Sequence, residues 1–177
     1  MTTIFIINWK RNGFKKLVEN YAGYNEWANG VVVEFLKVLP PNLLILEVKS
    51  SFSTILQTLQ HILVAQEFWL SVVAEVDYKA SDNSDSEDVS NILMLVIQSA
   101  DNLNKFVKNL SVTDLEKEIS TPWINDKLPI YEVLQHCFNH SSYHRGQLTT
   151  IFRQLEFADI PNVDFYEYLK VEVHGNP

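Results

Sequence analysis

Cysteine is almost absent from this sequence. Cys137 is the only one in 177 residues, so no disulfide can form within the chain. This excludes the small disulfide-rich scaffolds of secreted proteins and favours a reducing compartment. The first residues, MTTIFIINWKR, contain only a short apolar stretch, and charge follows it instead of preceding it, unlike a signal peptide. We therefore expect a cytoplasmic protein.

Positive charge and long apolar runs are also scarce. The chain has 14 Lys and Arg against 22 Asp and Glu, a formal net charge of −8. Because basic side chains supply most non-specific affinity for nucleic acids and anionic membranes, we expect neither partner. The densest basic patch is Lys10, Arg11, Lys15 and Lys16, which fits the solvated start of a helix. No run approaches the ~20 apolar residues that a membrane-spanning helix requires.

Glycine and proline are few, at five and six residues, and they lie mostly between long segments of helical periodicity. Helices are predicted over residues 14–38, 53–76 and 89–110, and from Pro129 onward. A proline suits the first turn of a helix, where its missing N–H costs nothing. Four helices in a chain of this length predict a single domain over residues 1–177, an all-α four-helix bundle.

The segments between these helices lack helical periodicity. Residues 79–90, KASDNSDSEDVS, are polar and acidic and indicate a solvent-exposed loop; a calcium site is the alternative, but the spacing matches no EF-hand. Residues 111–128 contain ISTPWIND and indicate an irregular crossing or a short strand pair. From Phe157 onward we expect a C-terminal tail.

Three of the five histidines fall in one stretch, HCFNHSSYHRG, at His136, His140 and His144. On a helix, His140 and His144 are about 40° apart and about 6 Å along the axis, so both imidazoles can reach one ion. His144 also lies on the apolar seam of its helix and is predicted to point into the core. A buried imidazole needs partners for both nitrogens, and either a metal ion or ordinary hydrogen bonds would provide them.

His61 is a candidate third ligand from the second predicted helix. It lies on the same helical face as Ala65, Phe68 and Val72, so an antiparallel neighbour would bring it opposite the His140 and His144 pair. The small Ala65, one turn on, would leave room for an ion or a substrate. Three neutral imidazoles with one open position describe a catalytic-type zinc site, or a site for a similar late transition metal.

Five nearby or remaining residues have weaker cases. His136 is a fourth ligand, a support for the ligands or a surface residue, and we favour the last two. His174, in VEVHGNP, is interpreted as incidental. Cys137 is expected to be a core thiol, because burial raises the pKa of a thiol and opposes a nucleophilic role. Arg145 is expected to pair with a carboxylate across the bundle or a dimer, with binding of a substrate anion as the less favoured alternative. Gly146 is expected to allow close approach of another backbone.

Four stretches of the sequence together resemble the DinB-like (DinB/YfiT) superfamily over nearly the whole chain: YNEWAN, SFSTILQTLQHILVAQEFWL, NHSSYHRGQL and PNVDFYEYL. The most specific element is His61 combined with H-x3-H-R-G-Q about eighty residues later. The resemblance implies a four-helix bundle with a three-histidine metal site, whose ligands on the matching positions are His61, His140 and His144. The assignment of His61 depends on this resemblance.

The same resemblance implies a cofactor and a partner. Nickel or zinc is the implied divalent ion, with water often completing its coordination, and a homodimer is the implied assembly. Trp9, Trp27 and the apolar flank of the first helix are possible contacts. The family's name records induction by DNA damage, which implies a stress response and gives no support for DNA binding.

Two functions are consistent with these observations. Relatives such as mycothiol-dependent maleylpyruvate isomerase and bacillithiol S-transferases imply a metal-dependent enzyme that activates a small thiol or water, of thiol S-transferase or hydrolase type. The alternative is a non-catalytic metal-binding protein whose ion is structural. No catalytic residue is identified, since neither Glu67 nor Gln147 has a compelling geometric case. An open site facing a pocket would favour the enzyme, and a closed site with His136 as fourth ligand the structural role.

Overall fold

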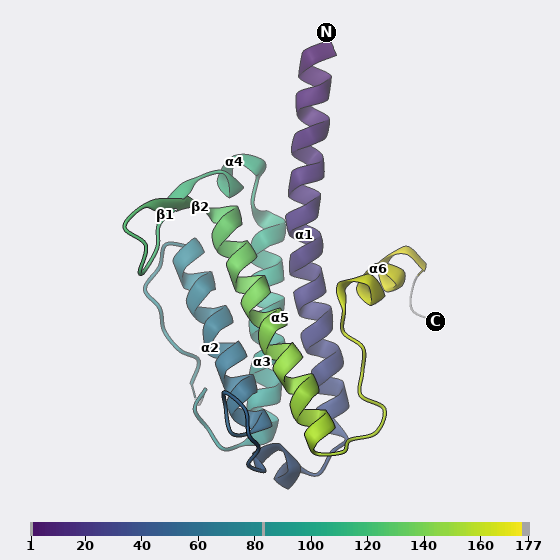
Figure 1. Cartoon of the computed structure of the whole chain (residues 1–177). Helices are drawn as coiled ribbons and strands as arrows, with labels where there is room; N and C mark the ends of the chain where they lie inside the picture. Colours follow the sequence, from purple (N-terminus) through teal and green to yellow (C-terminus); the bar gives the residue numbers. More distant parts are fainter. Residues whose placement is uncertain (1, 83, 175–177) are drawn as a thin grey trace.

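Helices make up most of the computed structural model, which describes residues 2–82 and 84–174 and the side chains of residues 13–82 and 84–172. Four long helices lie side by side as a bundle (Figure 1). The elements in chain order are α1 (Thr2–Lys37), the 3-10 helix η1 (Pro41–Ile45), α2 (Ile55–Val73), α3 (Val89–Asn109), α4 (Val112–Leu115), β1 (Glu118–Ser120), β2 (Lys127–Pro129), α5 (Ile130–Gln154) and α6 (Phe165–His174). The prediction of an all-α four-helix bundle is confirmed.

The helices begin where the chain can satisfy their free N–H groups. Thr54 precedes α2, and its hydroxyl accepts a hydrogen bond from the N–H of Gln57 at 3.0 Å. Asp88 precedes α3 and accepts in the same way from two backbone N–H groups of the first turn. Pro129 was predicted to lie in the first turn of α5. It is instead the last residue of β2, and α5 begins one residue later at Ile130.

Helix α1 is longer than the sequence indicated. It begins at Thr2, whereas the prediction began at Phe14, and its first turns project beyond the bundle (Figure 1). Gly13 immediately precedes the predicted start, but a single glycine weakens a helix without ending it when no proline follows. A Cβ at Gly13 would meet no atom within 4 Å, so no close contact requires a glycine there.

Each bundle helix packs against two others, α1 and α2 each lying against α3 and α5. The contacts bury apolar residues that recur every three or four positions, as in Ile92, Val96, Leu103 and Val107 of α3. Helix α2 runs antiparallel to α5 (Figure 1), so residues near the middle of one face the middle of the other. This pairing positions His61 opposite α5.

A buried polar layer crosses the middle of the bundle. Arg145 donates to the Oδ1 atoms of Asn25 and Asn29, each at 2.9 Å. Gln66 Oε1 accepts from the Nδ2 atoms of the same asparagines, at 2.6 and 3.0 Å, and Gln66 Nε2 donates to Ser99 Oγ at 2.9 Å. Among the described residues no carboxylate pairs with Arg145, so that prediction was wrong. The guanidinium donates instead to these two amide oxygens on α1 and to the hydroxyl of Ser142.

The connection before α5 contains the short strand pair that the sequence suggested. Strands β1 and β2 are antiparallel, with Ile119 opposite Leu128, and the short α4 precedes them. Trp123 lies in the turn between the strands with a positive φ of 66°. Apart from residue 83, the acidic segment 79–88 forms turns and no helix or strand, as expected for a loop.

The C-terminal segment contains helix α6, where the sequence predicted only a tail. Tyr168 of α6 is 6% exposed and packs against α1, with its ring centroid 5.8 Å from that of Trp27. Tyr24 of α1 also donates a hydrogen bond to the carbonyl of Val163 at 2.8 Å. Burial of these aromatic rings accounts for an ordered helix after Pro161.

Two further predictions fall at the margins of the described chain. The side chains of Trp9, a predicted dimer contact, and His174, interpreted as incidental, lie outside the described residues. Trp27 of α1 is half-buried and packs against Tyr168 of α6, which limits the surface it offers to another chain. The homodimer stays a prediction. No helix in the described part of the chain has both the length and the apolar character needed to cross a membrane.

Candidate metal centre

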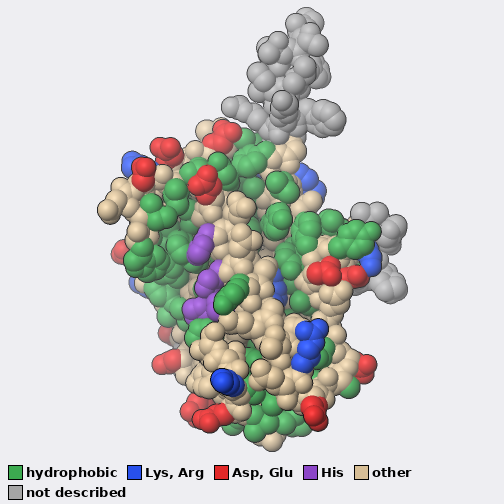
Figure 2. Space-filling model, viewed as in Figure 1, with side chains coloured by type: hydrophobic (Ala, Val, Ile, Leu, Met, Phe, Trp, Pro, Cys, Tyr) green, Lys and Arg blue, Asp and Glu red, His purple; other side chains and the backbone are tan. Residues whose placement is uncertain are grey.

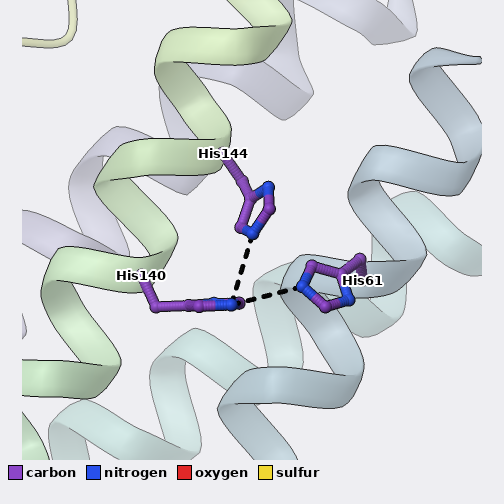
Figure 3. A group of neighbouring side chains, drawn as sticks. All are labelled: His61, His140 and His144. Carbon is purple, nitrogen blue, oxygen red and sulfur yellow. Dashed lines mark hydrogen bonds between the residues drawn. The ribbon is translucent and has the colours of Figure 1, made fainter. Parts of the chain in front are cut away.

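Three histidine side chains from two helices converge at one point. His61 comes from α2, and His140 and His144 come from successive turns of α5 (Figure 3). The Nε2 atom of His140 lies 3.2 Å from that of His61 and 3.3 Å from that of His144. One ring nitrogen of each residue lies within 4.8 Å of those of the other two. The structure thus brings together the three residues singled out in the sequence; that they hold a metal ion stays a prediction.

The spacing of these nitrogens fits a single small ion. Zinc–imidazole bonds of ~2.0–2.1 Å in a tetrahedral arrangement separate neighbouring ligand nitrogens by ~3.3 Å. The two Nε2–Nε2 distances of 3.2 and 3.3 Å match that separation. The ligand set is all imidazole, which suits zinc, nickel, copper or iron better than the oxygen-preferring magnesium and calcium.

Burial keeps the three imidazoles in the neutral form that binds metals. It lowers the pKa of His140 to about 4, and the neighbouring His144, His61 and His136 act in the same direction. Burial also lowers the pKa of His61, with a further contribution from His144. It lowers the pKa of His144 as well, although the hydrogen bond to Gln147 acts in the opposite direction. The site therefore needs little deprotonation before an ion binds near neutral pH.

Gln147 orients one of the candidate ligands, His144. Its Oε1 lies 2.8 Å from Nδ1 of His144, and its Nε2 donates to the hydroxyl of Ser51 at 3.1 Å. Because an amide oxygen only accepts, His144 must carry its proton on Nδ1 and leave the Nε2 lone pair free to face the other histidines. The sequence drew attention to Gln147 as a possible catalytic group; the structure gives it this supporting contact. The partner Ser51, in the segment before α2, carried no sequence signal.

The histidine cluster is covered on one side and reaches the surface on another. The ring of Phe52 packs over the cluster, with its centroid 4.6 Å from that of His61 and 5.7 Å from that of His144. Tyr143, which is 63% exposed, contacts the edge of His144 at 5.0 Å. Figure 2 shows histidine side chains at the surface beside hydrophobic ones. A small molecule can therefore approach the cluster from solvent.

His136 and Glu67 lie outside this group. His136 is exposed, with its ring 5.9 Å from that of His140 and in edge contact with Trp69 at 4.7 Å. This is one of the two roles favoured for it, a surface residue beside the cluster. Glu67 instead accepts hydrogen bonds from the backbone N–H and the hydroxyl of Ser81. Within the described side chains, this candidate group of metal ligands contains no carboxylate or thiol.

Cys137 and Gly146 had opposite outcomes. Cys137 is 1% exposed, and burial raises the pKa of its thiol to about 12, as expected of a core thiol. The close backbone contact predicted at Gly146 was wrong, because a Cβ there would meet no atom within 4 Å. The close approach occurs instead at Gly23, where a Cβ would lie 2.5 Å from the Tyr168 hydroxyl oxygen. This contact could not be predicted, because the sequence indicated a tail where helix α6 lies.

Comparison with solved structures confirms the fold. YfiT from Bacillus subtilis, described as a probable metal-dependent hydrolase with an unusual four-helix bundle topology, matches with a TM-score of 0.63 and 14% identity, over 80% of this chain and 89% of YfiT. YjoA, a DinB-like protein from Bacillus subtilis, matches with a TM-score of 0.64 and 14% identity, over 81% of this chain and 96% of YjoA.

Comparison of sequences identifies the family. Protein DinB from Bacillus subtilis (strain 168) is 25% identical over an alignment of 155 residues, and the match covers 82% of this chain and 90% of that protein. The model of the DinB family matches residues 12–172, which include all three histidines and helices α2 to α5. The chain therefore belongs to the DinB family.

Proposed function

We propose that this protein is a metal-dependent enzyme that activates water or a small thiol at its three-histidine cluster, and that it is a hydrolase or a thiol S-transferase. The observation that carries the proposal is the convergence of three Nε2 atoms from α2 and α5, with separations of 3.2 and 3.3 Å. These separations suit three ligands of one ion. The description of YfiT as a probable metal-dependent hydrolase agrees with this chemistry.

Zinc or nickel is the proposed ion, because the ligands are all imidazoles. A divalent ion held by His61, His140 and His144 would lower the pKa of a bound water or thiol and supply a nucleophile near neutral pH. The chain itself contributes orientation and shape. Gln147 holds the Nδ1 proton of His144, and Phe52 shields one side of the cluster from water. Both contacts favour a fixed arrangement of the ligands.

A non-catalytic, structural ion is the alternative. Structural zinc sites fill all four positions with protein ligands, often cysteines. This cluster offers three ligands among the described residues, Cys137 lies in the core, and His136 is outside the group. The incomplete ligand set and the open side toward solvent favour the enzyme.

Metal analysis of matched variants tests the proposal. Untagged protein, reconstituted with zinc or nickel and then desalted, is expected to retain about one ion per chain. His61→Ala, His140→Ala and His144→Ala should each lose it, whereas His136→Ala, the control from the same helix α5, should keep it. Elemental analysis gives the metal content, and ester hydrolysis and thiol conjugation assays give the activity.

Two results would contradict the proposal. Failure of the unmodified protein to retain any ion would remove the metal site itself. Full activity in the three metal-free variants would show that any turnover occurs without the cluster. A retained ion with no turnover of esters or thiols would support the structural alternative.

A further inference from the structure

Four aromatic side chains form a cluster beside the histidines that the proposed chemistry does not use. Phe68 and Trp69 lie on α2, Tyr78 follows that helix, and Trp123 lies in the turn between β1 and β2. Phe68 contacts Trp69 at 5.3 Å, Tyr78 at 5.5 Å and Trp123 at 5.7 Å between ring centroids. Trp69 and Trp123 are 6.1 Å apart. We call these four residues the aromatic platform.

His136 lies between the aromatic platform and the histidine cluster. Trp69 meets the ring of His136 edge-on at 4.7 Å, and His136 lies 5.9 Å from the candidate ligand His140. Two ring contacts therefore separate Trp69 from a nitrogen proposed to hold the ion. A molecule that lies against Trp69 and His136 would therefore lie beside the cluster.

Packing within the fold does not account for the exposed side chain and the backbone conformation of Trp123. Its side chain is 84% exposed, and the neighbouring Ile124 is 49% exposed. Its φ of 66° is an uncommon conformation for a bulky residue and costs free energy. Burial of the indole does not offset that cost, because most of the ring faces solvent. An exposed indole in a strained turn is more readily explained by a ligand that stacks on it.

The chemistry of the platform indicates a neutral aromatic ligand. All four side chains are uncharged near neutral pH, and burial and the nearby Glu67 raise the pKa of Tyr78 further. Glu67 itself is engaged by Ser81. An anionic ligand would find no cation among the four rings, whereas the face of an aromatic ring pairs with them in stacked or edge-on geometry.

We infer that the aromatic platform binds the aromatic part of the substrate, so that the enzyme acts on neutral molecules that carry an aromatic ring next to the reacting group. This inference rests on the proposed function, because it names the substrate class of the same site. Trp123 and Trp69 would hold the ring, and the histidine cluster would face the group that reacts. Their role would be to select and position the substrate.

Binding of a neutral aromatic probe tests the inference directly. 1-Naphthalenemethanol is titrated into the full-length protein, and its affinity is followed from the indole N–H signals in two-dimensional NMR spectra. Decahydronaphthalenemethanol, the saturated analogue, measures apolar binding without a ring face. The aromatic probe should bind more tightly than its analogue, and Trp123→Ala should weaken its binding about fivefold.

Matched variants keep the result specific to the platform. Trp123→Phe should retain most of the affinity, because it keeps a ring at that position. Tyr166→Ala should have no effect, since Tyr166 is a 68% exposed aromatic residue on α6, away from the platform. His140→Ala should bind the probe as the unmodified protein does, so the substrate inference is tested even if the metal proposal fails.

Three outcomes would overturn the inference. Equal affinity for the aromatic and saturated probes would show that the aromatic platform does not recognise the aromatic ring of a ligand. Unchanged binding by Trp123→Ala would place the probe elsewhere. A dimer that forms through the platform, seen as self-association lost in Trp123→Ala, would show that a second copy of the chain covers it.

Discussion

The contact between His144 and Gln147 orients a candidate metal ligand. An imidazole can carry its proton on either nitrogen, and only the tautomer protonated on Nδ1 directs a lone pair from Nε2 toward His61 and His140. The Gln147 oxygen, 2.8 Å from Nδ1, selects that tautomer. It does so without adding a negative charge, so the charge of a bound ion is left available to activate its fourth ligand. The hydrogen bond to Ser51 holds the amide in turn.

Replacement of Gln147 by alanine should therefore weaken metal binding without removing it. Loss of such an orienting hydrogen bond typically costs about 10–100-fold in metal affinity. Zinc affinity is measured by competition with a chromophoric chelator, and Gln135→Ala, at an exposed position of the same helix, is the control. Gln147→Glu keeps an acceptor and should bind zinc more tightly than Gln147→Ala. Equal affinities for Gln147→Ala and the unmodified protein would contradict the role assigned here.

Only part of this site follows from residue spacing. His140 and His144 are four positions apart on a strongly periodic helix, so their proximity follows from helical geometry alone. His61 is 79 residues from His140 in the chain, and its place beside them depended on the family resemblance. The contacts of Phe52 and Ser51 arise from the path of an irregular segment before α2, which no periodic pattern encodes.

Two glycines of helix α1 differ in whether a neighbouring helix leaves room for a side chain. Gly23 and Gly30 both lie in α1, one under helix α6 and the other in open space. A Cβ at Gly23 would lie 2.5 Å from the hydroxyl oxygen of Tyr168, whereas one at Gly30 would meet no atom within 4 Å. Tyr168 is 6% exposed and packed among aromatic rings, which limits its freedom to move aside.

The two substitutions to alanine should accordingly change stability in opposite directions. Gly30→Ala should raise the free energy of unfolding by about 1 kcal/mol, because alanine favours the helix and restricts the unfolded chain. Gly23→Ala should lower it, because the contact with Tyr168 outweighs that gain. Urea unfolding followed by circular dichroism measures both. In a Tyr168→Phe background the cost of Gly23→Ala should shrink, and a Gly23→Ala variant as stable as Gly30→Ala would refute the close packing of α6.

Helices with a long periodic pattern of apolar residues could be predicted from the sequence. Features that depend on packing between elements, such as helix α6, could not. The four bundle helices carry apolar residues at steps of three and four, so their existence could be predicted and their ends only roughly. Helix α6 spans ten residues after a proline, and its order depends on burial of Tyr168 against α1. Gly146 was misread because a glycine inside a helix shows that contact is possible there, not that it occurs.

At the scale of the molecule, the polar layer and the histidine cluster share the same two helices. Gln66 lies on α2 with His61, and Arg145 follows His144 on α5. Arg145 donates hydrogen bonds to Asn25 and Asn29, and both asparagines donate to Gln66. These bonds fix the positions of α1, α2 and α5 along one another's axes. A shift of α2 along α5 would break this network and separate His61 from His140 and His144. From the sequence, Arg145 was expected to pair with a carboxylate. The hydrogen-bond network that aligns α1, α2 and α5 was therefore not predicted.

An ion bound by ligands from both α2 and α5 should consequently stabilise the whole fold. The three nitrogens converge only in the folded chain, so binding favours the folded state by about 2.7 kcal/mol when free metal is 100 times its dissociation constant. For a chain of this size the melting temperature should rise by about 5–10 °C. Differential scanning calorimetry with zinc, and again after chelation by EDTA, measures the shift and its reversal. His144→Ala should show no zinc-dependent shift and His136→Ala should keep it; an equal shift in both variants would mean that zinc binds elsewhere and leaves α2 and α5 unlinked.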